Sequence, residues 1–183
     1  MTDTPSSSDP VLLPDGAELA RLVTNVTEPM CGMTFTPAAD HARGQSICGR
    51  MFLLPIAGQR DITIVLSSDA AGCQTLGAAM FQCPPEKLTR HQADDAIREL
   101  LNMVAGQIQT ALEIDQQLGL PRSTTMAELA TMGAAGFKEA MLLTSNGSGD
   151  IRLWIFEKTP PEAAPANRNG GFVRSLFRKF TSG

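Results

Sequence analysis

The sequence lacks the features that mark several classes of protein. None of the apolar runs in its 183 residues approaches the roughly 20 residues that a membrane-spanning helix needs. Its N-terminus, MTDTPSSSDP, has neither the basic start nor the apolar core of a signal peptide. The net charge of −4 argues against a nucleic-acid-binding protein, because phosphate backbones attract basic surfaces. We therefore expect a cytoplasmic protein that binds no nucleic acid.

Side chains that bind metals or act as nucleophiles are also few. No Cys-x-x-Cys spacing occurs among the four cysteines, which are Cys31, Cys48, Cys73 and Cys83. Scattered thiols in a cytosolic chain are typical of small buried hydrophobic residues, not of a zinc site or a redox pair. The two histidines, His41 and His91, fall in a polar turn and near a helix start, which argues against a catalytic triad. We expect no metal site and no cofactor of the protein's own.

The length and the 43% hydrophobic content are enough for one domain with a full core. The start of the chain is rich in Ser, Pro and Asp, and the stretch TPPEAAPANRNGG near its end is typical of a linker. We predict a disordered tail over residues 1–13, a domain over 14–158, a linker over 159–171 and a C-terminal tail over 172–183.

The predicted C-terminal tail has a basic amphipathic pattern. Phe172, Leu176 and Phe180 recur at helical spacing. They alternate with basic residues, which are Arg174, Arg178 and Lys179. Such a segment can make weak contact with an anionic membrane surface or fold into a groove on a partner. The alternative is a disordered soluble tail, because so short a helix is marginal in isolation.

The hydropathy pattern of the domain predicts an α/β fold of the α+β type. Helices are predicted over residues 16–30, 70–81 and most of 90–118, and strands over 33–37, 45–54, 61–68, 138–145 and 150–158. Asp15 and either Ser68 or Asp69 are suitable N-caps for the first two helices. We expect an antiparallel or mixed sheet of about five to six strands with the long third helix packed across it.

The last predicted strand carries apolar residues on both of its faces. Ile151, Leu153 and Ile155 share one face, whereas Trp154 and Phe156 lie on the other. The second face therefore needs cover, either from a helix or from a second subunit. For the second alternative, Trp154 and Phe156 are the candidates for a subunit interface.

The stretch from Arg90 to Leu118 organises the rest of the chain. It contains no proline and has a strong helical period. At about 100° per residue, one side of the helix is apolar, with Ile97, Leu101, Val104, Ile108 and Leu112. The opposite side is polar, with Gln92, Asp95, Glu99, Asn102, Gly106 and Thr110. Because the apolar side must pack on a core, the polar side is predicted to face outward.

This polar side holds two unusual features. Glu99 and Asn102 are three residues apart, so a carboxylate and a carboxamide lie side by side on the helix. Gly106 follows one turn later, although glycine weakens a helix interior by about 1 kcal/mol relative to alanine. A glycine opposite the core lets another backbone approach closely. The alternative interpretation is an ordinary solvated helix face with a chance glycine.

The pattern Asp95-x-x-x-Glu99-x-x-Asn102-Met103, followed by Val104-Ala105-Gly106, resembles the signature helix of the CheC/CheX/FliY phosphatases. These proteins act on the phosphorylated response regulator CheY. Only one Glu-x-x-Asn occurs on a predicted helix, so the single-site CheX arrangement is the closer match. The family's proline lies a little over twenty residues beyond the Asn, whereas Pro121 follows Asn102 by 121 − 102 = 19 positions. Because of that difference, the resemblance predicts the helix but not the loop that follows it.

The resemblance implies a phosphatase that acts on the aspartyl phosphate of a CheY-like receiver domain. Asn102 would enter the regulator's active site and position the attacking water, and Glu99 would engage the regulator's lysine. Asp95, Met103 and Gly106 would shape the surface that binds the partner. Mg²⁺ would be held by the regulator, and the protein would form a homodimer. The alternative is a non-catalytic adaptor that docks a receiver through the same helix and associates with a membrane through its tail.

Overall fold

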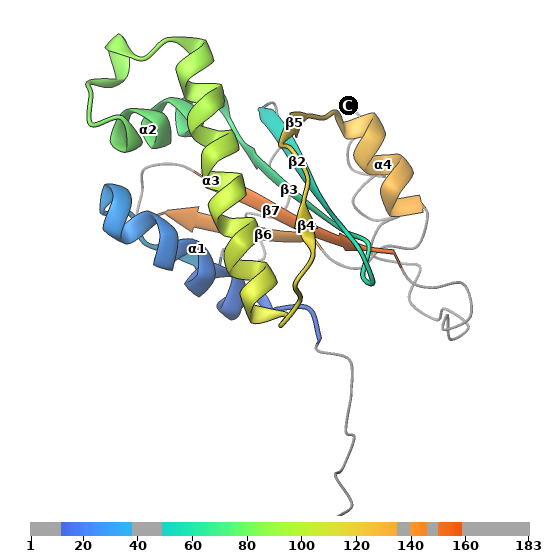
Figure 1. Cartoon of the computed structure of the whole chain (residues 1–183). Coiled ribbons are helices and arrows are strands. Elements are labelled where there is room, and N and C mark those ends of the chain that lie inside the picture. The colour runs from blue at the N-terminus through green and yellow to red at the C-terminus, as the bar shows by residue number, and fades with distance from the viewer. Residues whose placement is uncertain (1–11, 38–48, 135–139, 146–149, 159–183) are drawn as a thin grey trace, which may run out of the picture.

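A computed structural model describes residues 12–37, 49–134, 140–145 and 150–158 (Figure 1). Its helices are α1 (Gly16–Cys31), α2 (Ala70–Met80), the short 3₁₀ helix η2 (Pro85–Lys87), α3 (Arg90–Ala111) and α4 (Met126–Ala134). Its strands are β1 (Phe35–Pro37), β2 (Arg50–Ala57), β3 (Ile62–Ser68), β4 (Gln117–Leu118), β5 (Arg122–Ser123), β6 (Ala140–Ser145) and β7 (Asp150–Glu157). The predicted linker and C-terminal tail lie outside the described residues.

The strands form one antiparallel sheet. Its order is β1-β6-β7-β3-β2, and the two short strands β4 and β5 both pair with the outer edge of β2. The central pairing joins β3 to β7, with Val65 opposite Trp154 and Ile64 opposite Ile155. The predicted α/β fold is confirmed, and the sheet is antiparallel.

Local side-chain contacts explain where the helices begin. Asp15 accepts a hydrogen bond from the backbone N–H of Glu18 at 2.9 Å and thereby caps α1, as predicted. Asp69 is the residue that caps α2. At the start of α3, the Thr89 hydroxyl accepts from the Gln92 backbone N–H at 3.2 Å in a capping box. Each helix start is thus specified by a side chain adjacent to it in sequence.

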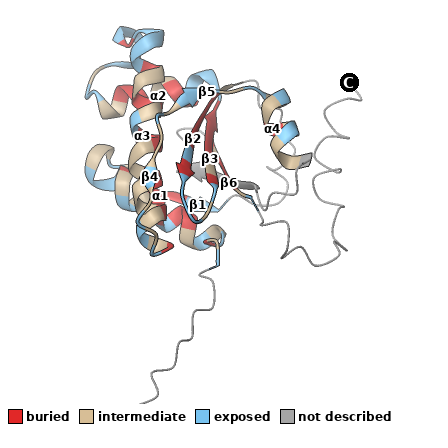
Figure 2. Ribbon diagram, turned by 45° about the vertical axis from the view of Figure 1, so that its right-hand side comes forward, coloured by how far each residue is buried: buried red, intermediate tan, exposed pale blue. Residues whose placement is uncertain are grey.

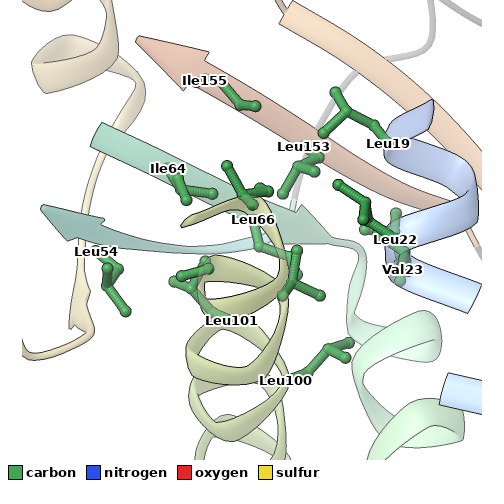
Figure 3. Close-up of a cluster of buried hydrophobic side chains, with 14 of the residues drawn as sticks. Leu19, Leu22, Val23, Leu54, Ile64, Leu66, Leu100, Leu101, Leu153 and Ile155 are labelled. Carbon is green, nitrogen blue, oxygen red and sulfur yellow. The ribbon is translucent and has the colours of Figure 1, made fainter. Parts of the chain in front are cut away.

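Helices α1, α2 and α3 cover one face of the sheet, and the main core lies between them and the sheet (Figure 2). The side chains that meet in this core come from two helices and from the sheet. They are Leu19, Leu22 and Val23 of α1, Leu100 and Leu101 of α3, and Ile64, Leu66, Leu153 and Ile155 of the sheet (Figure 3). The apolar side of α3 is therefore the side that attaches this helix to the sheet.

Helix α4 covers the opposite face of the sheet (Figures 1 and 2). Leu129 of α4 is 4% exposed and packs in a second cluster with Trp154 and Phe156, each of which is 7% exposed. Both aromatic side chains are thus buried within one chain. The prediction that Trp154 and Phe156 face a subunit interface is wrong, because a helix that we did not predict supplies their cover. Its nine residues, MAELATMGA, are too few to show a clear helical period.

The long helix also ends earlier than its pattern suggests. It stops at Ala111, and Glu113 takes a left-handed conformation with φ of 53°. Residues 117–118 then pair with β2 instead of continuing the helix. Similarly, the predicted strand over 45–54 is observed as Arg50–Ala57, with residues 45–48 outside the described part. The end of α3 is thus set by the pairing of the following residues with β2, and the local sequence pattern does not show it.

Candidate functional site

Helix α3 presents its polar side to the outside, as predicted. The apolar residues Ile97, Leu101, Val104 and Ile108 have no exposed surface, and Leu112 is 2% exposed. The packing of these side chains fixes the rotation of the helix about its axis. Consequently Glu99 is exposed, and Asn102, Met103 and Gly106 are partly exposed.

Gly106 stands in open space. A Cβ atom built at this position would meet no other atom within 4 Å. The glycine is therefore not required for packing within the chain, and its backbone is accessible to another molecule. The role of Gly106 as a position of close approach for a partner stays a prediction.

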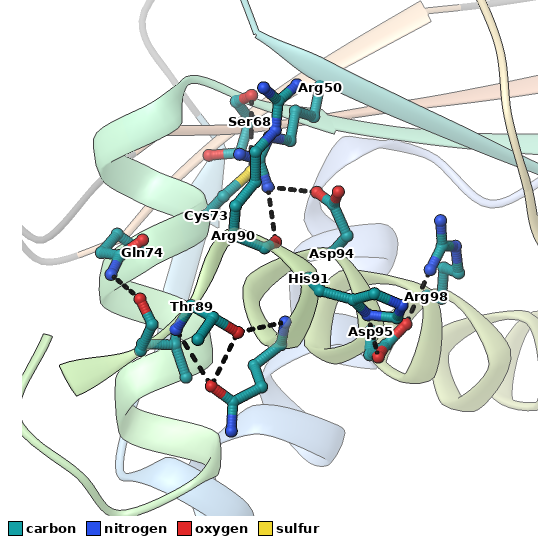
Figure 4. Close-up of polar contacts among 12 residues, drawn as sticks. Arg50, Ser68, Cys73, Gln74, Thr89, Arg90, His91, Asp94, Asp95 and Arg98 are labelled. Atoms are coloured by element: carbon teal, nitrogen blue, oxygen red, sulfur yellow. Dashed lines mark hydrogen bonds and ion pairs between the residues drawn. The ribbon is translucent and has the colours of Figure 1, made fainter.

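Asp95 is held within its own helix by two neighbours, Arg98 and His91 (Figure 4). Its Oδ1 accepts a hydrogen bond from Nη1 of Arg98 at 2.7 Å, and its Oδ2 lies 2.7 Å from Nδ1 of His91. The Arg98 guanidinium also lies over the ring of Phe52 in β2, 4.9 Å from its centre. Asp95 thus positions Arg98 beside the polar side of α3.

A second ion pair connects the start of α3 to strand β2. Arg50 pairs with Asp94 and donates a hydrogen bond to the backbone oxygen of Arg90 at 3.0 Å. Cys73 lies close to this pair, and its burial raises the pKa of its thiol to about 11, although the charge of Arg50 opposes the shift. The thiol therefore stays protonated near neutral pH and is a poor nucleophile.

Glu99 and Asn102 differ from the polar residues around them. Gln92 belongs to the capping box, Asp95 has two partners, and the Thr110 hydroxyl donates to the backbone oxygen of Gly106 at 3.0 Å. Among the residues that the structure describes, none hydrogen-bonds to or pairs with the side chains of Glu99 and Asn102. Both groups are available to a molecule outside the chain.

The described residues contain no group of three or more His, Cys, Asp or Glu side chains that could hold a metal ion. Within the same part of the chain, no helix is long and apolar enough to cross a membrane.

The sequence analysis missed the contacts that attach α3 to β2, made by Arg50 with Asp94 and by Arg98 with Phe52. These partners are more than forty residues apart, so no local pattern reveals them.

Comparison with known proteins assigns the chain to a family. The model of the family "Chemotaxis phosphatase CheX" matches residues 51–143, which are 143 − 51 + 1 = 93 of the 183 residues. The match contains all five residues that were predicted to form the site, from Asp95 to Gly106. A comparison with curated protein sequences finds no match.

Several solved structures have a similar fold. The CheX–CheY complex of Borrelia burgdorferi with BeF₃ and Mg²⁺ matches at a TM-score of 0.57 and 14% identity, over 79% of this chain and 99% of that one. CheX from Vibrio vulnificus gives a TM-score of 0.57 at 15% identity over the same shares. Thermotoga maritima FliY gives 0.51 at 11% identity, over 93% of this chain and 98% of that one. With the family match over half of its length, the chain belongs to the CheX family of chemotaxis phosphatases.

Proposed function

We propose that this protein hydrolyses the aspartyl phosphate of a CheY-type receiver domain through Asn102, with Glu99 engaging the receiver. One observation carries the proposal. Glu99 and Asn102 lie side by side on the outward side of α3, and no described residue hydrogen-bonds to or pairs with either side chain. Membership of the CheX family and the likeness to CheX in a complex with CheY support the same assignment.

The chemistry suits these two residue types. A water molecule attacks the phosphorus in line with the bond to the aspartate oxygen, that bond breaks, and the aspartate leaves as a carboxylate. Enzymes catalyse phosphoryl transfer mainly by positioning the reactants and stabilising charge. The carboxamide of Asn102 can donate to and accept from hydrogen-bonding partners, so it can hold the attacking water in one orientation. The carboxylate of Glu99 would pair with a lysine of the receiver.

The remaining predicted residues would act in docking. The open space at Gly106 lets a partner backbone approach α3, and the partly exposed Met103 adds apolar surface beside it. Asp95 already holds Arg98 and His91, so its contribution would be to position these two side chains. Mg²⁺ would be bound by the receiver, and this chain would need no cofactor of its own.

A homodimer and a cytoplasmic location are further parts of the proposal. Receiver domains of the CheY type act in the cytoplasm, and a phosphatase for them must meet them there. A dimer is implied by the CheX resemblance alone, since the second face of the sheet is covered by α4. Light scattering of the purified full-length chain would measure its mass directly.

The decisive experiment measures the loss of acyl phosphate from purified CheY-type receivers with Mg²⁺, with and without this protein. Asn102→Ala should lower the acceleration by roughly 100-fold or more, a typical effect of losing a group that acts on the reacting water. Binding to the receiver should change little, because the docking surface remains. Glu99→Ala should weaken both binding and rate. Neither variant should change the melting temperature, since exposed substitutions usually have small effects.

A matched control is Thr110→Ala, which removes an exposed polar side chain from the same side of α3 about two turns beyond Asn102. This variant should keep the full rate. If Asn102→Ala dephosphorylates receivers as fast as the unmodified protein, Asn102 does not act on the water. If the unmodified protein binds receivers without speeding the loss of acyl phosphate, the adaptor function, which needs only docking through α3, takes the place of the phosphatase.

A further inference from the structure

The two short strands β4 and β5 are one edge strand interrupted by a bulge. Residues on both sides of the interruption pair with β2, as Gln117↔Ala57, Leu118↔Ile56, Arg122↔Leu53 and Ser123↔Phe52. Three residues, 119–121, therefore lie opposite only two, 54–55. An extra residue in one strand of an antiparallel pair is a β-bulge, and bulges redirect side chains at sheet edges.

The bulge is held tightly at its base. The backbone N–H of Gly119 donates to the oxygen of Pro55 at 2.7 Å, and that of Thr124 donates to Met51 at 3.0 Å. A Cβ atom at Gly119 would lie 2.6 Å from Cγ of Pro55, so this close approach requires a glycine. The next residue, Leu120, is 87% exposed.

Two contacts between α3 and the edge of the sheet, one near each end of the edge strand, place this bulge beside the candidate site. The guanidinium of Arg98 lies over Phe52 near one end of the edge strand, and the Gln109 side chain donates to the backbone oxygen of Gln116 at the other. Helix α3 and strand β2 thus run in the same direction. On α3, Asn102 lies between the contact residues Arg98 and Gln109. On β2, the residues opposite the bulge lie between Phe52 and Ala57, so the bulge and Asn102 are at similar heights along the two parallel elements. The edge strand runs alongside α3 in Figure 1.

We propose that Leu120 is an apolar contact for the receiver domain that docks on α3, and that it contributes to the choice of receiver. This inference rests on the proposed function. A docking surface made of Glu99, Asn102, Gly106 and the partly exposed Met103 offers little apolar area, and apolar burial is the main source of affinity. Leu120 and the partly exposed Pro121 form an apolar patch at the bulge, on the edge strand that runs alongside α3 (Figure 1).

The receiver is a better occupant of this patch than a second copy of the chain. Pro121 has no backbone N–H, and the bulge breaks the regular spacing of the edge, so both oppose strand pairing with another sheet. The patch also lies on the strand that runs alongside α3, the helix on which the receiver is proposed to dock. The matching surface would be an apolar one beside the phosphorylated aspartate.

The test compares Leu120→Ser with the unmodified chain in two assays. In the dephosphorylation assay, the concentration of phosphorylated receiver that gives half of the maximal rate should rise five- to tenfold, while kcat stays the same. In the second assay, purified receivers treated with beryllium fluoride and Mg²⁺ are titrated with Asn102→Ala, with and without Leu120→Ser. The Kd should rise by the same factor, and Leu120→Met should restore it.

The control is Leu12→Ser, which removes another highly exposed leucine, 81% exposed, from the residues that precede α1. It should change neither value. An unchanged half-saturating concentration and Kd for Leu120→Ser, in a protein that is otherwise active, overturns the role of Leu120 alone. A change of oligomeric mass in Leu120→Ser assigns the patch to a subunit contact and also overturns it. If the unmodified chain neither binds nor dephosphorylates any receiver, both the function and this inference fall.

Discussion

The guanidinium of Arg98 lies 4.9 Å from the centre of the Phe52 ring, one helical turn before Asn102. The same group donates a hydrogen bond to Asp95. A cation over an aromatic ring attaches α3 to β2 at a point close to the candidate site. The position of Asn102 relative to the sheet, and to the exposed Leu120 on its edge, depends on this attachment.

Replacing Arg98 tests this attachment. Arg98→Ala removes the contact with Phe52 and the pair with Asp95, so we expect the free energy of unfolding to fall by about 1 kcal/mol, since both contacts are partly solvated. The dephosphorylation rate should fall only a few-fold. Arg98→Lys keeps the charge but loses the planar stacking, and its effect should be intermediate. Urea unfolding and acyl-phosphate decay measure the two quantities.

A loss of rate as large as that of Asn102→Ala, with unchanged stability, would mean that Arg98 contacts the partner directly.

Substitutions at Gly106 should separate stability from activity. Because a Cβ there meets nothing within 4 Å, Gly106→Ala should raise the free energy of unfolding by roughly 0.5–1 kcal/mol. Gly106→Leu should also fold stably, but its side chain should block the docking surface and weaken receiver binding. Thermal unfolding and titration with a beryllium-fluoride-treated receiver measure these effects.

Gly77 provides the contrasting control for that experiment. A Cβ atom there would lie 2.6 Å from Cδ2 of Leu88 and 3.2 Å from Cα of Ala93, so Gly77→Ala should destabilise the packing of α2 against α3. Destabilisation by Gly106→Ala as large as that by Gly77→Ala would contradict the assignment of Gly106 to a surface without a packing role.

Helix α4 should behave as part of the core. Leu129→Ala removes a side chain that is 4% exposed and packs with Trp154 and Phe156, so it should lower the free energy of unfolding by about 2–4 kcal/mol. The mass in light scattering should not change. A drop in mass without loss of stability would instead return these residues to a subunit interface.

The basic C-terminal segment, residues 172–183, lies outside the described residues. Its weak binding to anionic membranes therefore stays a prediction. Co-sedimentation of the full chain with vesicles rich in phosphatidylserine should fall as salt is raised, because the attraction between basic residues and anionic lipids is screened. Truncation after Pro165 should abolish it. Failure to sediment even at low salt would leave the soluble-tail alternative.

The sequence by itself determined those features in which neighbouring residues decide the structure. The 3.6-residue period of α3 separated Ile97 and Leu101 from Glu99 and Asn102, and Asp15 capped α1, as predicted. The Glu99–Asn102 spacing likewise identified the candidate site, because residues three apart on a helix are always adjacent.

Tertiary structure alone decided what depends on contacts between distant segments. The cover of Trp154 by α4, the contact of Arg98 with Phe52, and the bulge that exposes Leu120 all require elements to be placed against one another. The side chain of Asp94 carries no local signal for the partner that it finds in another element, Arg50 of β2. The residues of the site could therefore be named from the sequence, whereas the surface around them is created by the packing of α3 against β2 and the edge strand.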